Sequence, residues 1–143
     1  MIRIPLNVYE YAGSLRVMAH FWLKSEILGK SIPIKAIVDT GSPVTMVGPL
    51  DLGRMRISTL KLKGLQGKNN PVNIGGGQIV TKVLTDTSLK FMNGFEINLS
   101  VEFPIEGKKN PNQPSLLGVD FLLKTKAKLI FNPSKKEAYF EIE

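Results

Sequence analysis

The sequence predicts an all-β fold, a small closed β-barrel with one or two short helices. Segments rich in strand-forming residues recur along most of the 143 residues, and several alternate apolar and polar positions. Turn-forming pairs separate these segments, of which Asn93-Gly94 is the strongest two-residue hairpin signal. The count of about nine or ten strands is typical of a barrel.

The first part of the chain predicts a meander of three strands. Residues 1–14 form an N-terminal strand, at an edge of the fold or at an interface, and end in the turn Ala12-Gly13-Ser14. Strand-forming residues then fill Leu15 to Leu23. After a turn at Gly29-Lys30, the apolar run Ile32–Val38 indicates a mostly buried strand.

The middle of the chain predicts a hairpin with a glycine-rich tip. The segment Gly48–Gly53 is broken by Pro and Gly and indicates a loop or one helical turn, and Ile57–Lys63 alternates as a strand does. Residues 62–79 form the hairpin, and Ile79–Leu84 continues as a strand. A phosphate-binding loop is disfavoured, because Gly67-Lys68 is followed by Asn69-Asn70-Pro71 and not by a helix with Ser or Thr.

The last part of the chain predicts two further hairpins and a short helix. Thr87–Met92 and Phe95–Phe103 flank Asn93-Gly94, and Pro104–Pro114 is a polar loop. Leu116-Leu117-Gly118 then leads into a short amphipathic helical turn. Lys128–Phe131 and Ala138–Ile142 make the final hairpin.

Composition excludes several classes of protein. Residues 1–143 have the length of one domain, and the absence of cysteine excludes disulfides, thiolate metal sites and a Cys nucleophile. His20 is the only histidine, so a Ser-His-Asp triad and a metal cluster are both disfavoured, and we expect no cofactor. No apolar run is long enough to span a membrane, no signal peptide is evident, and we expect a cytoplasmic protein.

The net charge of +7 permits binding to nucleic acid, but the pattern of the basic residues argues against it. The lysines are spread along the chain and concentrate in predicted turns such as Lys108-Lys109 and Lys135-Lys136. They form no basic stripe interleaved with aromatic residues. We interpret the charge as a solvated surface.

The candidate site is Asp39-Thr40-Gly41-Ser42, where the apolar strand ends. A carboxylate there is costly to bury unless hydrogen bonds or a function compensate for the cost. Gly41 allows close approach of another chain, and Thr40 and Ser42 supply hydroxyl groups on either side. These residues suit a positioned catalytic carboxylate. The alternative is an ordinary turn between two strands, which turn chemistry alone explains.

From Leu15 to Ile142 the chain resembles the retropepsins, the single-domain aspartic protease family of retroviral proteases and their cellular relatives. Three elements carry the resemblance, in the order in which the family has them: Ile37-Val38-Asp39-Thr40-Gly41-Ser42, the glycine-rich hairpin, and Leu116-Leu117-Gly118-Val119-Asp120-Phe121-Leu122. The barrel is then of the retropepsin type, and the hairpin is the flap that closes over substrate.

The resemblance implies a role for each residue of the catalytic loop. Asp39 is the catalytic acid, and Thr40 contacts the opposite loop across a dimer. Gly41 lets the substrate backbone approach, and Ser42 hydrogen-bonds the acid.

Further roles are implied outside this loop. Leu116 and Leu117 pack beside the loop, and Gly118 starts the helix. The flap tip that contacts substrate is placed at Gly64, Leu65, Gln66 and Gly67, with Lys68–Asn70 as the alternative.

Two departures indicate a cellular rather than a retroviral type. Retroviral members usually carry an arginine at the position of Val119, paired with an acid soon after the catalytic triplet. Here both are missing, which leaves no orphan charge. The tail beyond Leu123 is also longer than in retroviral enzymes, so the resemblance does not supply the details of the dimer interface, which in those enzymes has interleaved termini.

One catalytic triplet implies two chains. Peptide hydrolysis of this type needs an acid and a base, which two close carboxylates supply by sharing a proton. Asp86-Thr87-Ser88 lacks the glycine, and Asp120 is expected to face solvent or cap the short helix. We therefore expect a homodimeric endopeptidase acting on peptides or proteins, with Asp39 of each subunit in one site. The alternatives are a non-catalytic module that binds peptide or dimerises, and a basic barrel that binds nucleic acid.

Overall fold

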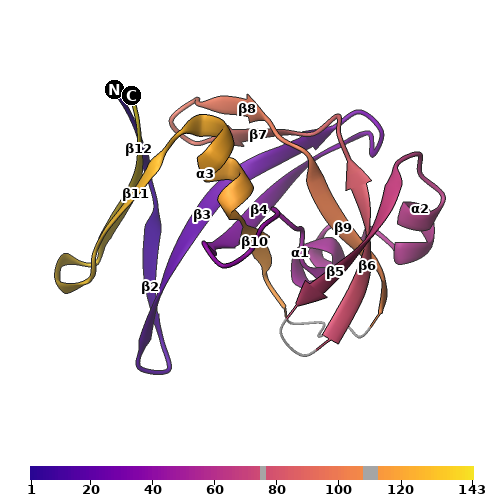
Figure 1. The fold of residues 1–143 in the computed structure, drawn as a ribbon, viewed down its shortest axis with the longest axis horizontal. Helices are drawn as coiled ribbons and strands as arrows, with labels where there is room; N and C mark the ends of the chain where they lie inside the picture. Colours follow the sequence, from indigo (N-terminus) through magenta and orange to yellow (C-terminus); the bar gives the residue numbers. More distant parts are fainter. Residues whose placement is uncertain (75–76, 108–112) are drawn as a thin grey trace.

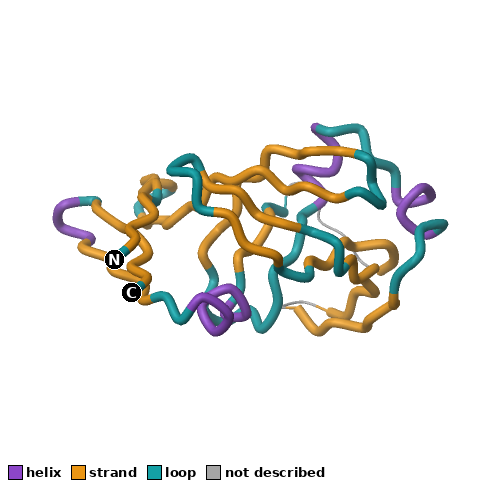
Figure 2. Tube along the Cα trace, turned by 90° about the horizontal axis from the view of Figure 1, so that it is seen from above, coloured by secondary structure: helices purple, strands orange, loops and turns teal. Residues whose placement is uncertain are grey.

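The computed structural model describes residues 1–74, 77–107 and 113–143. Figures 1 and 2 show the fold, which is mostly β with a few short helices. The strands are β1 (Ile2–Pro5), β2 (Asn7–Tyr11), β3 (Ser14–Ser25), β4 (Lys30–Val38), β5 (Lys68–Ile74), β6 (Gly77–Leu84), β7 (Ser88–Phe91), β8 (Glu96–Asn98), β9 (Val101–Gly107), β10 (Ser115–Leu117), β11 (Lys128–Asn132) and β12 (Glu137–Ile142). The helices are α1 (Pro49–Arg54), α2 (Thr59–Lys63), α3 (Val119–Thr125) and the 3-10 turn η1 (Pro133–Lys135).

The central sheet has the strand order β10-β4-β3-β7-β8, and β2 also pairs with β3. β3 is long enough to pair with β2 along its first part and with β7 along its second. β4 alternates cleanly, with Ile32, Ile34 and Ala36 buried and Pro33 and Lys35 exposed. The strand that leads to Asp39 is therefore buried on one face only.

Two smaller sheets flank the central one. In the sheet β5-β6-β9, the β5–β6 hairpin pairs with β9 through β6. In the terminal sheet β1-β12-β11, the last strand lies between the first strand and β11. The two chain ends therefore lie side by side in Figure 1.

The expected closed barrel is not found. Pairing among the described strands runs along three open paths and does not return on itself. A closed barrel needs hydrogen bonding between strands all the way round. Here the sheets are held together by side chains, because buried residues from all three contribute to one apolar cluster.

Aromatic rings connect the terminal sheet to the central sheet. Phe121 of α3 lies 5.0 Å from Phe140 of β12 and 5.5 Å from Phe91 of β7, measured between ring centroids. Phe91 is in turn 5.5 Å from Phe21 of β3. Helix α3, which follows the predicted Leu116-Leu117-Gly118 motif, is thereby fixed against both sheets.

Four secondary-structure predictions are corrected. The single strand expected over residues 1–14 is two strands, β1 and β2, in different sheets, and the single strand expected over Phe95–Phe103 is divided between β8 and β9. The segment Ile57–Lys63 contains the helix α2 and not a strand, because the Ser58 hydroxyl caps the helix by accepting from the backbone N–H of Lys61 at 3.1 Å. The predicted polar loop Pro104–Pro114 begins later than expected, since β9 continues to Gly107. Its residues 108–112, with Lys108-Lys109, lie outside the described residues.

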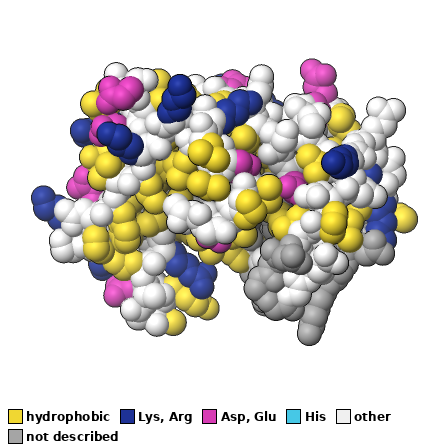
Figure 3. Space-filling model, viewed as in Figure 1, with side chains coloured by type: hydrophobic (Ala, Val, Ile, Leu, Met, Phe, Trp, Pro, Cys, Tyr) yellow, Lys and Arg dark blue, Asp and Glu magenta, His cyan; other side chains and the backbone are white. Residues whose placement is uncertain are grey.

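Among the described residues, basic side chains do not gather into one patch on the face drawn in Figure 3. Lysine and arginine side chains stand at separate positions there, between acidic and hydrophobic ones. In the part of the chain that the structure describes, no helix has the length and hydropathy needed to cross a membrane.

Candidate active site

Asp39 lies where two distant segments of the chain meet. β10 pairs in parallel with the end of β4, placing Leu116 opposite Ile37 and Leu117 opposite Val38. The backbone N–H of Asp39 then donates to the carbonyl of Leu117 at 3.0 Å. The two sequence motifs are thus neighbours in space, as the resemblance implies.

The carboxylate of Asp39 is half-buried and held by its own loop. The backbone N–H of Gly41 donates to Oδ1 of Asp39 at 2.9 Å, and the N–H of Ser42 donates to the Asp39 carbonyl at 3.1 Å. Thr40 and Gly41 are exposed beside it. This turn fixes one carboxylate oxygen while the loop stays open on the side of Thr40.

Ser42 does not make the hydrogen bond to the acid that the resemblance implies. Its side chain is buried, and its hydroxyl donates to the carbonyl of Val44 at 2.7 Å. Within this chain the Ser42 hydroxyl therefore stabilises the loop after Asp39. The Asp39 carboxylate accepts from the backbone N–H of Gly41 instead.

Gly118 is required by close packing of the loop against the start of α3. A Cβ atom there would lie 2.5 Å from the carbonyl oxygen of Val44 and 2.7 Å from that of Ser42. The neighbouring N–H of Val119 donates to the Ser42 carbonyl at 2.8 Å. Leu117 is buried and Leu116 is half-buried, and β10 places both beside the end of β4.

Asp120 has a role that sequence reasoning missed. It neither faces solvent nor serves only as a helix cap, because it accepts from the backbone N–H of Thr45 at 2.9 Å and from the Thr45 hydroxyl at 2.8 Å. It also accepts from the N–H of Phe121. Partial burial raises the pKa of Asp120, the hydrogen bonds from Thr45 and Phe121 lower it, and the nearby charge of Glu102 raises it again.

The glycine segment chosen as the flap tip lies elsewhere. Gly64–Gly67 connects α2 to β5, and Lys68–Asn70 already pairs with β6, so neither is the turn of the hairpin. The pairing of β5 with β6 ends at Ile74 and Gly77, and residues 75 and 76 between them lie outside the described residues.

The Gly64–Gly67 segment is itself bound to β6. The buried side chain of Lys82 donates to the carbonyl of Leu65 at 3.0 Å. Gly67 has φ +146°, and a Cβ there would lie 2.7 Å from the carbonyl of Val83. Gly67 therefore allows a tight connection at the base of the hairpin.

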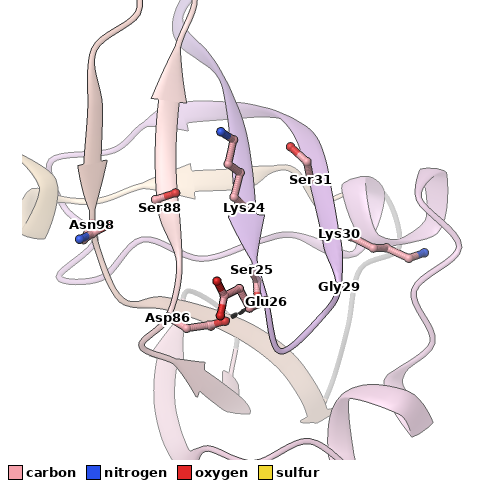
Figure 4. A pocket seen from close by; sticks show the side chains of 9 residues that line it. All are labelled: Lys24, Ser25, Glu26, Gly29, Lys30, Ser31, Asp86, Ser88 and Asn98. Atoms are coloured by element: carbon pink, nitrogen blue, oxygen red, sulfur yellow. Dashed lines mark hydrogen bonds between the residues drawn. The ribbon is translucent and has the colours of Figure 1, made fainter.

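A polar pocket lies at the other end of β4 from Asp39 (Figure 4). It is lined by Lys24, Ser25, Glu26, Gly29, Lys30, Ser31, Asp86, Ser88 and Asn98. The Asp86 carboxylate is already occupied by hydrogen bonds from the Ser25 hydroxyl and the Ile27 N–H. Lys30 points away from it in Figure 4. Nothing in this pocket matches the chemistry of the Asp39 loop.

A smaller pocket includes His20, whose neighbours fit a structural role. The His20 ring stacks on Tyr9 with 6.1 Å between ring centroids. Burial and the charge of Lys35 lower the pKa of His20. Across the described residues, His, Asp and Glu side chains form no group of three that would hold a metal ion.

Comparison with known proteins identifies the fold. No protein-family model matches the chain, and no curated protein sequence matches it. Among solved structures, a retropepsin-like aspartic protease from Rickettsia conorii aligns with a TM-score of 0.58 and 16% identity, covering 99% of this chain and 99% of that one. The EIAV protease in complex with the inhibitor HBY-793 aligns with a TM-score of 0.53 and 17% identity, covering 86% of this chain and 100% of that one.

The chain therefore has the retropepsin fold, and the solved structures that it resembles are aspartic proteases. At this level of identity the likeness defines the fold alone. The function has to be argued from Asp39 and its surroundings.

Proposed function

We propose that the protein is an aspartic endopeptidase that acts as a homodimer. The observation that carries the proposal is the half-buried Asp39 carboxylate, held by the Gly41 N–H in an Asp-Thr-Gly turn at the end of β4, within a retropepsin fold. Thr40 and Gly41 remain exposed around it, which leaves room for a partner loop and for substrate.

In the proposed reaction, Asp39 of each subunit holds one water molecule. One carboxylate is ionised and takes a proton from the water molecule while the water oxygen attacks the peptide carbonyl carbon. The other is protonated and gives its proton to the carbonyl oxygen. Collapse of the tetrahedral intermediate breaks the C–N bond, and the leaving amine takes up a proton from the pair.

The geometry of the terminal sheet favours a dimer contact that differs from the interleaved termini of the retroviral enzymes. Interleaving requires a free edge on the C-terminal strand, whereas β12 is paired on both sides by β1 and β11 of its own chain. We place the contact at the exposed Thr40 and Gly41 and along the outer edge of β11, where Phe131 is exposed. The partner's Asp39 then completes the site.

The peptide substrate would bind as an extended strand between the catalytic loop and the β5–β6 hairpin. The apolar side chains of Ile37 and Leu116, half-buried next to Asp39, would contact its side chains.

The test combines sedimentation with a cleavage assay on a mixed peptide library, with and without a statine-type inhibitor. A dimer whose cleavage is blocked by the inhibitor and absent in Asp39→Asn supports the proposal. Asp86→Asn is the matched control, because Asp86 is also followed by threonine but lies at the other end of β4. A folded Asp39→Asn protein with near wild-type cleavage, or a strict monomer, would overturn it. A dimer that binds peptides without cutting them would indicate a non-catalytic binding module.

A further inference from the structure

We propose that Glu102 is a positioning residue that fixes the β5–β6 hairpin to the loop carrying Asp39. The inference rests on the proposed function, because the position of the hairpin affects a reaction only if Asp39 reacts. Glu102 is an acidic side chain that the proposed chemistry does not use, and it is only 5% exposed.

The side chain of Glu102 binds both strands of the hairpin. Its Oε1 accepts from the hydroxyl of Thr81 in β6 at 2.6 Å and from the side-chain amide of Asn70 in β5 at 3.0 Å. Thr81 is fully buried and Asn70 is half-buried. Hydrogen bonds to a carboxylate are stronger than those between neutral groups, so this contact constrains the hairpin more than ladder pairing alone.

The backbone of Glu102 binds the catalytic loop. Its N–H donates to the carbonyl of Thr45 at 3.1 Å, and its carbonyl accepts from the N–H of Val47 at 2.9 Å. Thr45 is the residue that Asp120 holds by two hydrogen bonds. Glu102 therefore contacts the hairpin through its side chain and the loop after Asp39 through its backbone.

Burial of the Glu102 carboxylate in β9 has a cost that its hydrogen bonds must offset. The other buried positions described in this strand are uncharged: Val101, Phe103, Pro104 and Ile105. An apolar side chain at residue 102 would avoid the cost of removing a carboxylate from water. What it would lose is the pair of directed contacts to Thr81 and Asn70, which set the orientation of the hairpin.

The expected consequence concerns substrate binding. A hairpin that contacts the peptide equally in the ground state and in the transition state stabilises both by the same amount. Displacement of the hairpin therefore raises KM more than it lowers kcat. We expect Glu102→Leu to raise KM about tenfold, the equivalent of one hydrogen bond to a charged group, with a smaller change in kcat.

The experiment compares Glu102→Leu with Glu102→Gln. Glutamine keeps an oxygen that accepts from both Thr81 and Asn70, and is expected to restore KM to near the wild-type value. Glu96→Leu is the control, since Glu96 is an acid in β8 whose exposed side chain contacts Ser88 and Lys24. Amide hydrogen exchange of the free protein is measured alongside. Exchange should become about tenfold faster in β5 and β6 of Glu102→Leu and stay unchanged in β3 and β4, because only the hairpin is released.

Each outcome decides the inference. Selective loss of protection in the hairpin of Glu102→Leu, reversed in Glu102→Gln, supports it. Unchanged hairpin exchange in Glu102→Leu, uniform loss of protection over the whole chain, or a glutamine variant no better than leucine would overturn it. The exchange measurement needs no substrate, so a wild-type protein that fails to cleave peptides refutes the proposed function while the link between hairpin and loop is still decided.

Discussion

Thr45 and Asp120 are joined by two hydrogen bonds across 75 residues of sequence. The Thr45 hydroxyl donates to Asp120 and accepts from the backbone N–H of Gly118 at 3.1 Å. The loop after Asp39 and the first turn of α3 are thereby held as one unit. Asp39 lies between this unit and the end of β4.

The first prediction concerns the pH dependence of stability. Burial holds the pKa of Asp120 above its ordinary value of 3.8, so the folded protein binds this proton more tightly than the unfolded chain. The contribution of Asp120 to stability is therefore full below the unfolded pKa and is lost as pH rises through the folded pKa. In urea denaturation across that window, the stability of wild type relative to Asp120→Asn should fall as pH rises.

A titration of the Asp120 carboxyl group by NMR checks the cause. Thr45→Val removes one hydrogen bond that lowers the pKa of Asp120, so this pKa should rise further. Glu102→Gln removes a nearby negative charge and should lower the same pKa. Shifts in the opposite directions would contradict the assignment.

The second prediction concerns Gly118. Gly118→Ala forces a methyl group against the backbone carbonyls of Val44 and Ser42, and should lower the free energy of unfolding by about 2 kcal/mol. Gly53→Ala is the control, because a Cβ at this position in α1 meets nothing within 4 Å. That variant should gain up to about 1 kcal/mol from helix propensity. Urea denaturation measures both, and an equal effect of the two changes would refute the packing argument.

The third prediction concerns the aromatic core. Phe121 is fully buried between Phe91 and Phe140, so Phe121→Ala should destabilise the protein by about 3–5 kcal/mol. Leu123→Ala changes the same helix at a side chain that is 73% exposed, and should cost about 0.5 kcal/mol or less. Thermal unfolding separates the two variants. A small effect of Phe121→Ala would mean that α3 is not anchored through this ring.

The fourth prediction concerns a buried carboxylate outside the site. Asp51 is 1% exposed, and it accepts from the Ser115 hydroxyl at 2.6 Å and also contacts Arg54. Ser115 also accepts from the N–H of Gly48 at 2.8 Å. Ser115→Ala leaves the Asp51 carboxylate and the Gly48 N–H without this partner. It should lower the free energy of unfolding by about 2 kcal/mol, measured by urea denaturation. Ser134→Ala, at an exposed turn, should be neutral, and equal costs for the two serines would contradict the prediction.

The parts of the site that local signals specify were predictable from the sequence. An apolar strand that ends in Asp39-Thr40-Gly41 and a leucine pair before Gly118 each indicate their structure within a few residues. The close approach of Gly118 to Val44 explains why glycine stands there, but its partner becomes evident only from the structure.

The misassigned segments lacked a decisive local signal. Leu60 and Leu62 alternate with lysines as in a strand, yet in α2 Leu60 is 80% exposed and Leu62 is fully buried. Five residues are too few for the helical and the strand period to differ, and only the Ser58 cap indicates the helix. The flap tip was misplaced because the glycines of Gly64–Gly67 have the composition of a hairpin turn, and only the register of β5 on β6 excludes both this segment and Lys68–Asn70.

The link through Glu102 could not have been predicted from the sequence. Asn70, Thr81 and Glu102 carry no common motif, and they meet only because β5, β6 and β9 lie side by side in one sheet. The two-residue alternation of side chains along each strand indicates which face of the sheet a residue occupies. It does not indicate which residue of the neighbouring strand that residue contacts.

The pairing of β1 with β12 has a consequence for the order of folding. Ile2 lies opposite Ile142, so this contact closes a loop that includes almost the whole chain. The entropy of closing so long a loop is recovered only once the rest of the chain is compact, whereas β11 and β12 are joined by a short turn and can pair early. The first strand should therefore dock last, and the loop that carries Asp39 should be formed before the two ends of the chain meet.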